Sequence, residues 1–175
     1  MTDPTKELQR IFEFVVKHKA DTMDWPSPVI RRFLKWAAYY RRLFIVHADT
    51  KDGGRRIIAV GTAWRTESLS PNLDKLDFEH TEFGNYLFIH QCIVHPEFRN
   101  AGVLFQMLCL GLQRYPECHT AYWNDSSCKT RVVPINRFMK LLSAQISPPK
   151  LRPFIRRESW EAIKSPAFQI LKPLA

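Results

Sequence analysis

The stretch that decides the fold runs from Tyr86 to Tyr115: YLFIHQCIVHPEFRNAGVLFQMLCLGLQRY. Its aromatic and β-branched beginning, which stops at His95-Pro96, predicts a strand over 86–94. A helix is predicted to open at Gly102, with one apolar face made of Leu104, Met107, Leu108 and Gly111. A strand that enters a helix through a tight turn exposes the free N–H groups of the first helical turn. Those donors and the positive end of the helix dipole suit a pyrophosphate group.

The turn itself matches the signature of a known family. Residues 94–104 read VHPEFRNAGVL. The GNAT superfamily of N-acetyltransferases has a typical pattern at this place. A strand ends near V-x-P-x-[FY]-R, and the next helix starts with [QR]-x-x-G-x-[GA]. The chain therefore resembles this superfamily, over a motif of about thirty residues and an element order that extends across most of its length.

The resemblance implies a coenzyme A site in this segment. The residues that would wrap the pyrophosphate are Arg99, Asn100, Ala101, Gly102, Val103 and Leu104. Glycine permits close approach of the backbone, and an arginine adds a fixed positive charge. The backbone of Cys92, Ile93 and Val94 would pair with the pantetheine arm like an added strand. Acetyl-CoA is thus the implied co-substrate and a primary amine the acceptor, with the oxyanion held by a backbone N–H near Val94.

Two residues depart from the family pattern. Leu104 stands where the family has its last small residue, so its side chain would crowd the phosphates. Phe138 stands in the later helix where many members carry a tyrosine that protonates the leaving thiolate. A phenylalanine cannot donate a proton. These departures bear directly on whether the chain catalyses a reaction.

His90 is a candidate general base. Members that use a strand carboxylate have it where this chain has Phe88, and His90 follows two residues later on the same face by strand alternation. An unperturbed histidine pKa of ~6.5 suits the deprotonation of an ammonium near neutral pH. The alternative is a histidine that packs in the sheet and bonds to the backbone.

The rest of the chain follows the family's order of elements. Pro4 and Pro28 suit the first turns of two helices, whose apolar stripes are Leu8, Ile11, Phe12 and Val15, and Ile30, Phe33, Leu34 and Ala37. A hairpin is expected over 43–64, further strands over 119–123 and 167–171, and a last helix over 134–143. We therefore predict an α/β protein: a GNAT-like mixed, mostly antiparallel central sheet flanked by helices, in a single acyl-CoA N-acyltransferase-like domain over 1–175.

Composition excludes several other classes. The chain has 175 residues, 45% hydrophobic and 25% charged, a balance typical of globular proteins. No apolar run approaches the ~20 residues that cross a bilayer, and the N-terminus is polar, so a transmembrane or secreted protein is not expected. The four cysteines contain no CxxC pair and match no zinc spacing. They indicate reduced thiols, no metal and a cytoplasmic location.

The charge pattern suggests the kind of partner. A net charge of +9 suits an anionic ligand, but the basic residues are scattered in pairs, which favours a solvated surface over a nucleic-acid groove. Residues 67–86 contain five acids and one lysine. An acidic loop would match an amine acceptor opposite an anionic coenzyme, unless it is simply a solvated loop.

Two hypotheses of function remain open. The first is an acetyl-CoA-dependent N-acetyltransferase, a GNAT-type acyltransferase, which Arg99 and Gly102 favour. The second is a catalytically degenerate protein of the same fold with a binding or structural role, for example an accessory protein of a phage or virus, which Leu104 and Phe138 favour. Fold alone does not decide between them.

Overall fold

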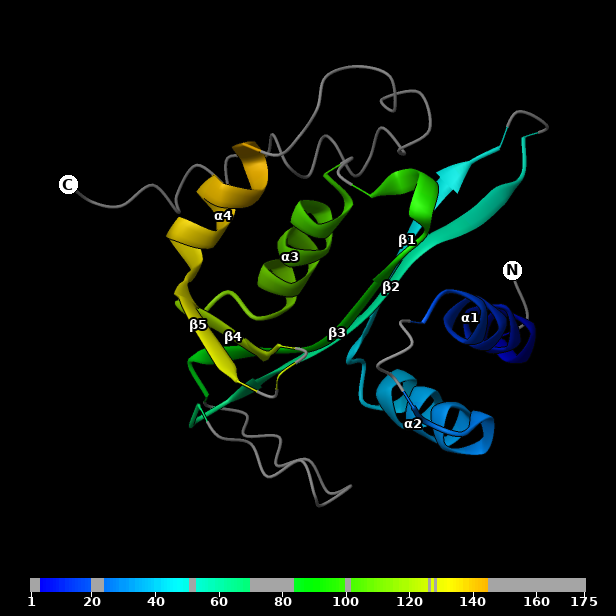
Figure 1. Ribbon diagram of the computed structural model, residues 1–175, viewed down its shortest axis with the longest axis horizontal. Coiled ribbons are helices and arrows are strands. Elements are labelled where there is room, and N and C mark those ends of the chain that lie inside the picture. Colours follow the sequence, from blue (N-terminus) through cyan, green and yellow to red (C-terminus); the bar gives the residue numbers. More distant parts are fainter. Residues whose placement is uncertain are drawn as a thin grey trace.

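The computed structural model describes residues 4–19, 24–50, 53–69, 84–99, 102–125, 127 and 129–144. Its elements in chain order are α1 (Pro4–His18), α2 (Ser27–Tyr39), β1 (Leu43–Asp49), β2 (Arg55–Thr66), β3 (Tyr86–Val94), the 3₁₀ turn η1 (Pro96–Phe98), α3 (Val103–Arg114), β4 (Thr120–Asn124), β5 (Thr130–Pro134) and α4 (Ile135–Ala144). A central sheet separates α1 and α2 on one face from α3 and α4 on the other (Figure 1).

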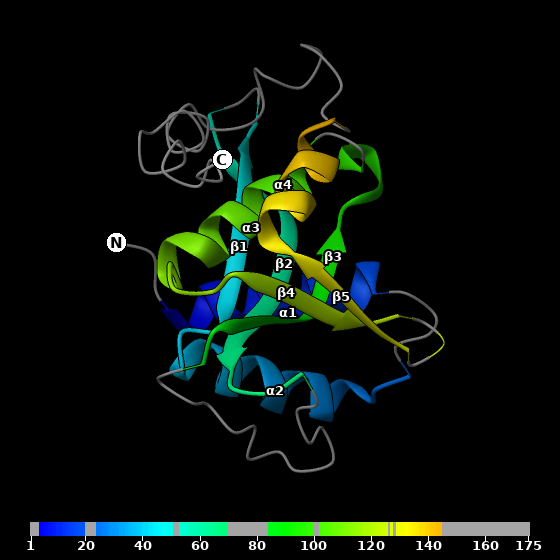
Figure 2. The same cartoon turned by 90° about the vertical axis from the view of Figure 1, so that its left-hand side faces the viewer.

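The sheet is mixed and mostly antiparallel, as predicted. Its strand order is β1-β2-β3-β4-β5, and only the β3–β4 pair is parallel among the described strands. This pair is short, because it runs only from Tyr86↔Thr120 to Phe88↔Tyr122. Pairing of β3 with β2 continues to Val94. Beyond Phe88 the two parallel strands therefore diverge, and Figure 2 shows β3 turning away from β4.

A β-bulge interrupts β3 at the point where it leaves β4. The register passes from Thr62↔Gln91 to Ala63↔Ile89, so β3 contributes one additional residue, His90. Bulges bend a strand and redirect its side chains, and they are frequent next to functional sites. His90 still shares a face with Phe88, as predicted, since their ring centroids lie 6.0 Å apart.

The two faces of the sheet are covered by the apolar stripes that the sequence predicts. The predicted stripe of α2, Ile30, Phe33, Leu34 and Ala37, is entirely buried. On α1, Ile11 and Val15 are buried, whereas Leu8 and Phe12 are only partly covered. On the opposite face, Met107 and Leu108 of α3 belong to the main core. Helical periodicity thus predicted the buried face of α2, whereas α3 is buried on most of its surface and Leu104 of its predicted face is only partly buried.

The C-terminal part of the fold differs from the prediction. β5 is not among the predicted strands, and it precedes α4, which begins at Ile135 rather than Pro134. Most residues of β5 are exposed, so the strand lacks the hydrophobic alternation that marks a half-buried strand. The strand predicted over 167–171 lies outside the described residues.

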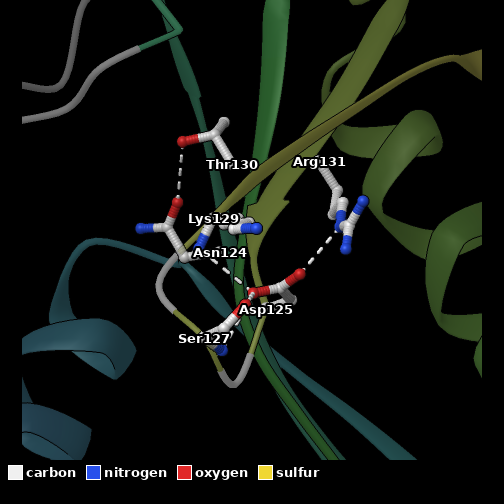
Figure 3. A network of polar contacts seen from close by, with 6 residues as sticks. All are labelled: Asn124, Asp125, Ser127, Lys129, Thr130 and Arg131. Carbon is white, nitrogen blue, oxygen red and sulfur yellow. Dashed lines mark hydrogen bonds and ion pairs between the residues drawn. The ribbon is translucent and has the colours of Figure 1, made fainter.

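Local polar contacts at Asp125 close the β4–β5 hairpin (Figure 3). One carboxylate oxygen accepts hydrogen bonds from the backbone N–H groups of Ser127 and Lys129 and from the Ser127 hydroxyl. The other accepts from Arg131 Nε at 2.7 Å. These contacts, the Ser127 hydroxyl foremost, lower the pKa of Asp125 to about 2. Turn chemistry, rather than burial, therefore sets the position of β5.

Close packing of α3 on β2 gives a first prediction. A Cβ atom added at Gly61 would overlap the side chain of Met107 and lie 3.1 Å from the Gln91 carbonyl oxygen. We expect Gly61→Ala to lower the free energy of unfolding by about 1 kcal/mol, the low end of the usual cost of overpacking, because the Met107 methyl can shift whereas the Gln91 carbonyl oxygen belongs to the backbone. Gly111→Ala is the matched control, because its Cβ would meet only Leu87, at an ordinary 3.6 Å. Chemical denaturation that finds equal losses in both variants would contradict this packing.

Candidate functional site

The turn between β3 and α3 presents an uncapped helix terminus. Gly102 adopts a φ of 76°, in the left-handed region that favours glycine, and stands at the N-cap of α3. Glycine has no side chain with which to cap this terminus, and the first intrahelical bond that involves Gly102 runs from Gln106 N–H to the Gly102 carbonyl, at 3.0 Å. The N–H groups of Val103, Leu104 and Phe105 precede that bond and therefore have no acceptor within the helix.

A cavity of about 230 Å³ lies at this turn. It is lined by Val94, Phe98, Arg99, Gly102, Val103, Leu104, Phe105 and Leu142. The structure thus gathers most of the predicted pyrophosphate residues around one hollow, with Arg99 as the charged member of the lining. The predicted residues Asn100 and Ala101 lie outside the described part of the chain.

Arg99 is tied to the end of β3. Its Nε donates to the Val94 carbonyl oxygen at 3.4 Å, and its backbone N–H donates to the Pro96 carbonyl oxygen at 3.3 Å. The side chain is exposed, so the guanidinium stands at the solvent side of the cavity. A fixed cation beside free helix donors is a chemically suitable setting for a phosphate group.

The backbone direction at the end of β3 follows from one hydrogen bond. The N–H of His95 donates to the Ile58 carbonyl oxygen at 2.8 Å and so points toward β2. Because N–H and C=O groups alternate in direction along an antiparallel strand, those of Val94 and Cys92 point away from β2. These N–H and C=O groups face the edge of β3 along which β4 no longer pairs. Ile93, the third residue predicted for pantetheine pairing, turns its backbone toward its β2 partner Val60 instead.

Leu104 occupies two environments. Its side chain is partly buried and packs against the main core, and it lines the turn cavity. It also lines a second cavity of about 30 Å³ between α3 and the sheet, together with Gly61, Cys92 and Met107. Leu104 therefore stands beside the candidate phosphate position, while the core holds part of its surface.

His90 lies on the other face of the sheet, among aromatic rings. The ring centroids of Phe33, Trp64 and Trp25 lie 5.0, 5.6 and 5.7 Å from that of His90. Its Nδ1 is 3.2 Å from the Thr62 hydroxyl, which is a side-chain contact within the sheet. Burial lowers the pKa of His90 to about 4, so the imidazole is neutral at physiological pH. The structure does not place His90 in the lining of the turn cavity.

Phe138 is packed in the core. Its ring stacks on Trp123 of β4, with centroids 5.1 Å apart and an interplanar angle of 22°. The residue that α4 contributes to the turn cavity is Leu142, one helical turn later. A packed ring at position 138 supplies no proton donor to that cavity.

The described cysteines are chemically inert. Burial raises the pKa of Cys92 and Cys109 to about 12 and that of Cys118 to about 11, so all three are protonated thiols near neutral pH. Within the described residues, no three His, Cys, Asp or Glu side chains converge as metal ligands would. Among the helices of this part of the chain, none has the length and apolarity that a membrane span requires.

One pair of histidines near the turn could not be predicted from the sequence. The rings of His18, at the end of α1, and His95, directly after β3, lie 4.6 Å apart. No local spacing could have indicated this pair, because the two histidines are far apart in the sequence and meet only through the packing of α1 on the sheet.

The architecture is a mixed α/β fold whose parallel strands diverge, with a strand–turn–helix unit at that divergence, and the order of its described elements up to α4 agrees with the GNAT-like fold that the sequence predicts, apart from β5. No family model matches the sequence, and no curated protein matches it. Two solved structures are similar in fold. One is the "GphF GNAT-like decarboxylase in complex with isobutyryl-CoA", with 13% identity and a TM-score of 0.49 over 69% of this chain and 62% of that one.

The second is the loading GNATL domain of CurA from Lyngbya majuscula, with 15% identity and a TM-score of 0.48 over 70% of this chain and 62% of that one. The match thus spans less than two thirds of the length of each of these two solved structures. Both likenesses concern the fold, and any function has to be argued from the residues of this chain.

The setting of His90 gives a prediction about pH. Its pKa is about 4 in the folded chain and ~6.5 when exposed, so the unfolded state takes up the proton first as the pH falls. We expect the free energy of unfolding to decrease from about pH 6.5 to pH 4, and His90→Gln to reduce that slope. Titration of the His90 ring followed by NMR measures the pKa directly. A midpoint near 6.5 would refute the buried, neutral imidazole.

Proposed function

We propose that this chain binds acetyl-CoA at the β3–α3 turn and transfers the acetyl group to a primary amine. The observation that carries the proposal is the cavity of about 230 Å³, where the uncapped terminus of α3 and Arg99 meet. The residues present fit the coenzyme, since its pyrophosphate needs hydrogen-bond donors and positive charge at close range. Leu104 lines the same cavity, and its side chain would take up part of the space that the phosphates need.

The pyrophosphate would bind at the start of α3. The N–H groups of Val103, Leu104 and Phe105 would donate to its oxygens, and the left-handed Gly102 lets the backbone approach without a side chain in the way. Arg99, held by its Nε on the Val94 carbonyl, would add the balancing charge.

The pantetheine arm would bind along the outward edge of β3. Amide groups along this arm would pair with the outward backbone of Cys92 and Val94, as an added strand pairs with a sheet edge. Because the pyrophosphate lies at the turn, the arm would run back along β3 from Val94 toward Cys92 and bring the thioester to this edge of the strand. The outward N–H of β3 near Val94 that the arm leaves unpaired would then donate to the oxyanion that forms when an amine attacks the carbonyl carbon.

The chemistry requires one bond to form and one to break. The amine nitrogen bonds to the carbonyl carbon, the carbon–sulfur bond breaks, the amine loses a proton and the thiolate takes one up. His90 is neutral at physiological pH, but the burial that lowers its pKa to about 4 makes it a weak base, so solvent would take up the proton of the amine. Phe138 supplies none to the leaving thiolate, whose pKa of ~8.5 lets solvent complete the step slowly.

A second function is favoured by the stacking of Phe138 on Trp123. A chain that binds the coenzyme without an acid at this position would act as a binding protein rather than as an enzyme.

The proposal of an amine acceptor for the transferase rests on the acidic composition of residues 67–86, most of which lie outside the described part of the chain.

Calorimetric titration with acetyl-CoA tests the binding step. Gly102→Asp and Gly102→Asn form a matched pair, because both side chains tolerate the left-handed conformation and only one is charged. We expect Gly102→Asn to bind acetyl-CoA more weakly than the native chain, because its side chain stands where the backbone would approach the phosphates. Gly102→Asp should bind about tenfold more weakly than Gly102→Asn, because its negative charge also faces the phosphates. Equal affinity of the two variants, or no heat from the native chain at millimolar ligand, would reject the site.

The same preparations decide between the two functions. Release of free thiol in the presence of acetyl-CoA and a primary amine, above the rate without protein, supports the transferase. Binding without any thiol release supports the coenzyme-binding protein.

A further inference from the structure

A cluster of ionisable side chains borders the turn on the α1 side of the sheet. The rings of His18 and His95 lie 4.6 Å apart at an angle of 56°. His18 also contacts Phe14 of α1, with ring centroids 4.8 Å apart, and His95 contacts Phe98 of η1 at 5.8 Å. Both rings are only partly exposed, and each is held by an aromatic neighbour of its own element.

The cluster carries an excess of potential positive charge. Arg99 and Lys17 both act electrostatically on His18, and Arg56 of β2 lies over the Phe98 ring, 4.8 Å from its centroid. Among the described residues in contact with this cluster, Glu97 is the carboxylate. It bonds Arg56 at 3.0 Å and lies 3.9 Å from His95 Nδ1.

The orientation of His95 leaves a donor available. Its Nδ1 accepts a hydrogen bond from the Glu97 backbone N–H at 3.3 Å. In the neutral ring the proton is therefore assigned to Nε2. On His18, burial, then the neighbouring His95, and then Lys17 and Arg99 lower the pKa, so protonation is disfavoured while no anion is bound.

Arg99 connects this cluster to the turn cavity. It lines the cavity, and it is close enough to His18 to affect its charge state. We propose that His18, His95 and Arg99 together form a second anion site, which binds a phosphate monoester of the molecule whose pyrophosphate occupies the turn. This inference rests on the proposed function, under which the monoester is the 3′-phosphate of coenzyme A.

Such a site couples binding to protons. A phosphate dianion beside the two rings would stabilise their protonated forms, so the ligand and protons would bind together. Affinity for a ligand with a monoester should therefore rise as the pH falls from 8 to 6.5. A ligand that lacks the monoester but keeps the pyrophosphate should not show this dependence. The titratable and charged side chains that face this site are those of His18, His95, Lys17, Arg56, Arg99 and Glu97.

The experiment compares coenzyme A with 3′-dephospho-coenzyme A by calorimetric titration at pH 8 and pH 6.5. For the native chain we expect the ratio of their affinities to increase about five- to tenfold on acidification, as uptake of one proton allows. His18→Gln and His95→Gln should each remove most of this increase; glutamine at 95 keeps an acceptor for the Glu97 N–H. His119→Gln, an exposed histidine on the approach to β4, is the matched control and should retain it.

The outcomes separate the two proposals. If both ligands bind and their affinity ratio is the same at both pH values, the second anion site is refuted and the turn site stands. If neither ligand binds, the proposed function fails and the further inference fails with it. The native chain alone decides these cases, so the test does not depend on whether a variant folds.

Discussion

The structure depends on the divergence of two parallel strands. β3 pairs with β2 up to Val94, whereas its pairing with β4 ends at Phe88↔Tyr122. A parallel pair buried within a sheet normally keeps its ladder, because unpaired backbone groups are costly. Here the bulge at His90 bends β3 away, and the strand continues into the turn that starts α3. The outward backbone of Cys92 and Val94 and the terminus of α3 are consequences of this one departure.

The two faces of the sheet contribute different chemistry to that edge. The α3 face supplies a cavity lined by apolar side chains, with the Arg99 guanidinium at its opening. The α1 face supplies the paired rings of His18 and His95, and further along β3 the aromatic surroundings of His90. Arg99 belongs to the turn and lines the cavity on the α3 face, and its charge also acts on His18 on the α1 face.

Sequence patterns predicted what depends on local periodicity. The bounds of β3 and the buried stripe of α2 agree with the prediction, since alternating and helical spacings fix them directly. β5 was missed because its residues are mostly exposed and its place is set by the contacts of Asp125. The ring pair of His18 and His95 was also missed, because it arises from packing between distant segments.

The candidate site shows the same division. The motif located Arg99 and Gly102 at the turn, where the cavity lies. It did not reveal that Phe138 stacks in the core, nor that burial keeps His90 neutral, because both depend on tertiary neighbours. The roles of these residues in binding and catalysis are still predictions.

Amide hydrogen exchange with and without acetyl-CoA tests the central claim most directly. Donors that bind the ligand exchange more slowly, and the claim concerns particular backbone N–H groups. The account predicts slower exchange at Val103, Leu104 and Phe105 and at Cys92 and Val94, with little change in the β4–β5 hairpin. Saturating ligand that leaves these amides unchanged, or protects a different surface, would contradict the account.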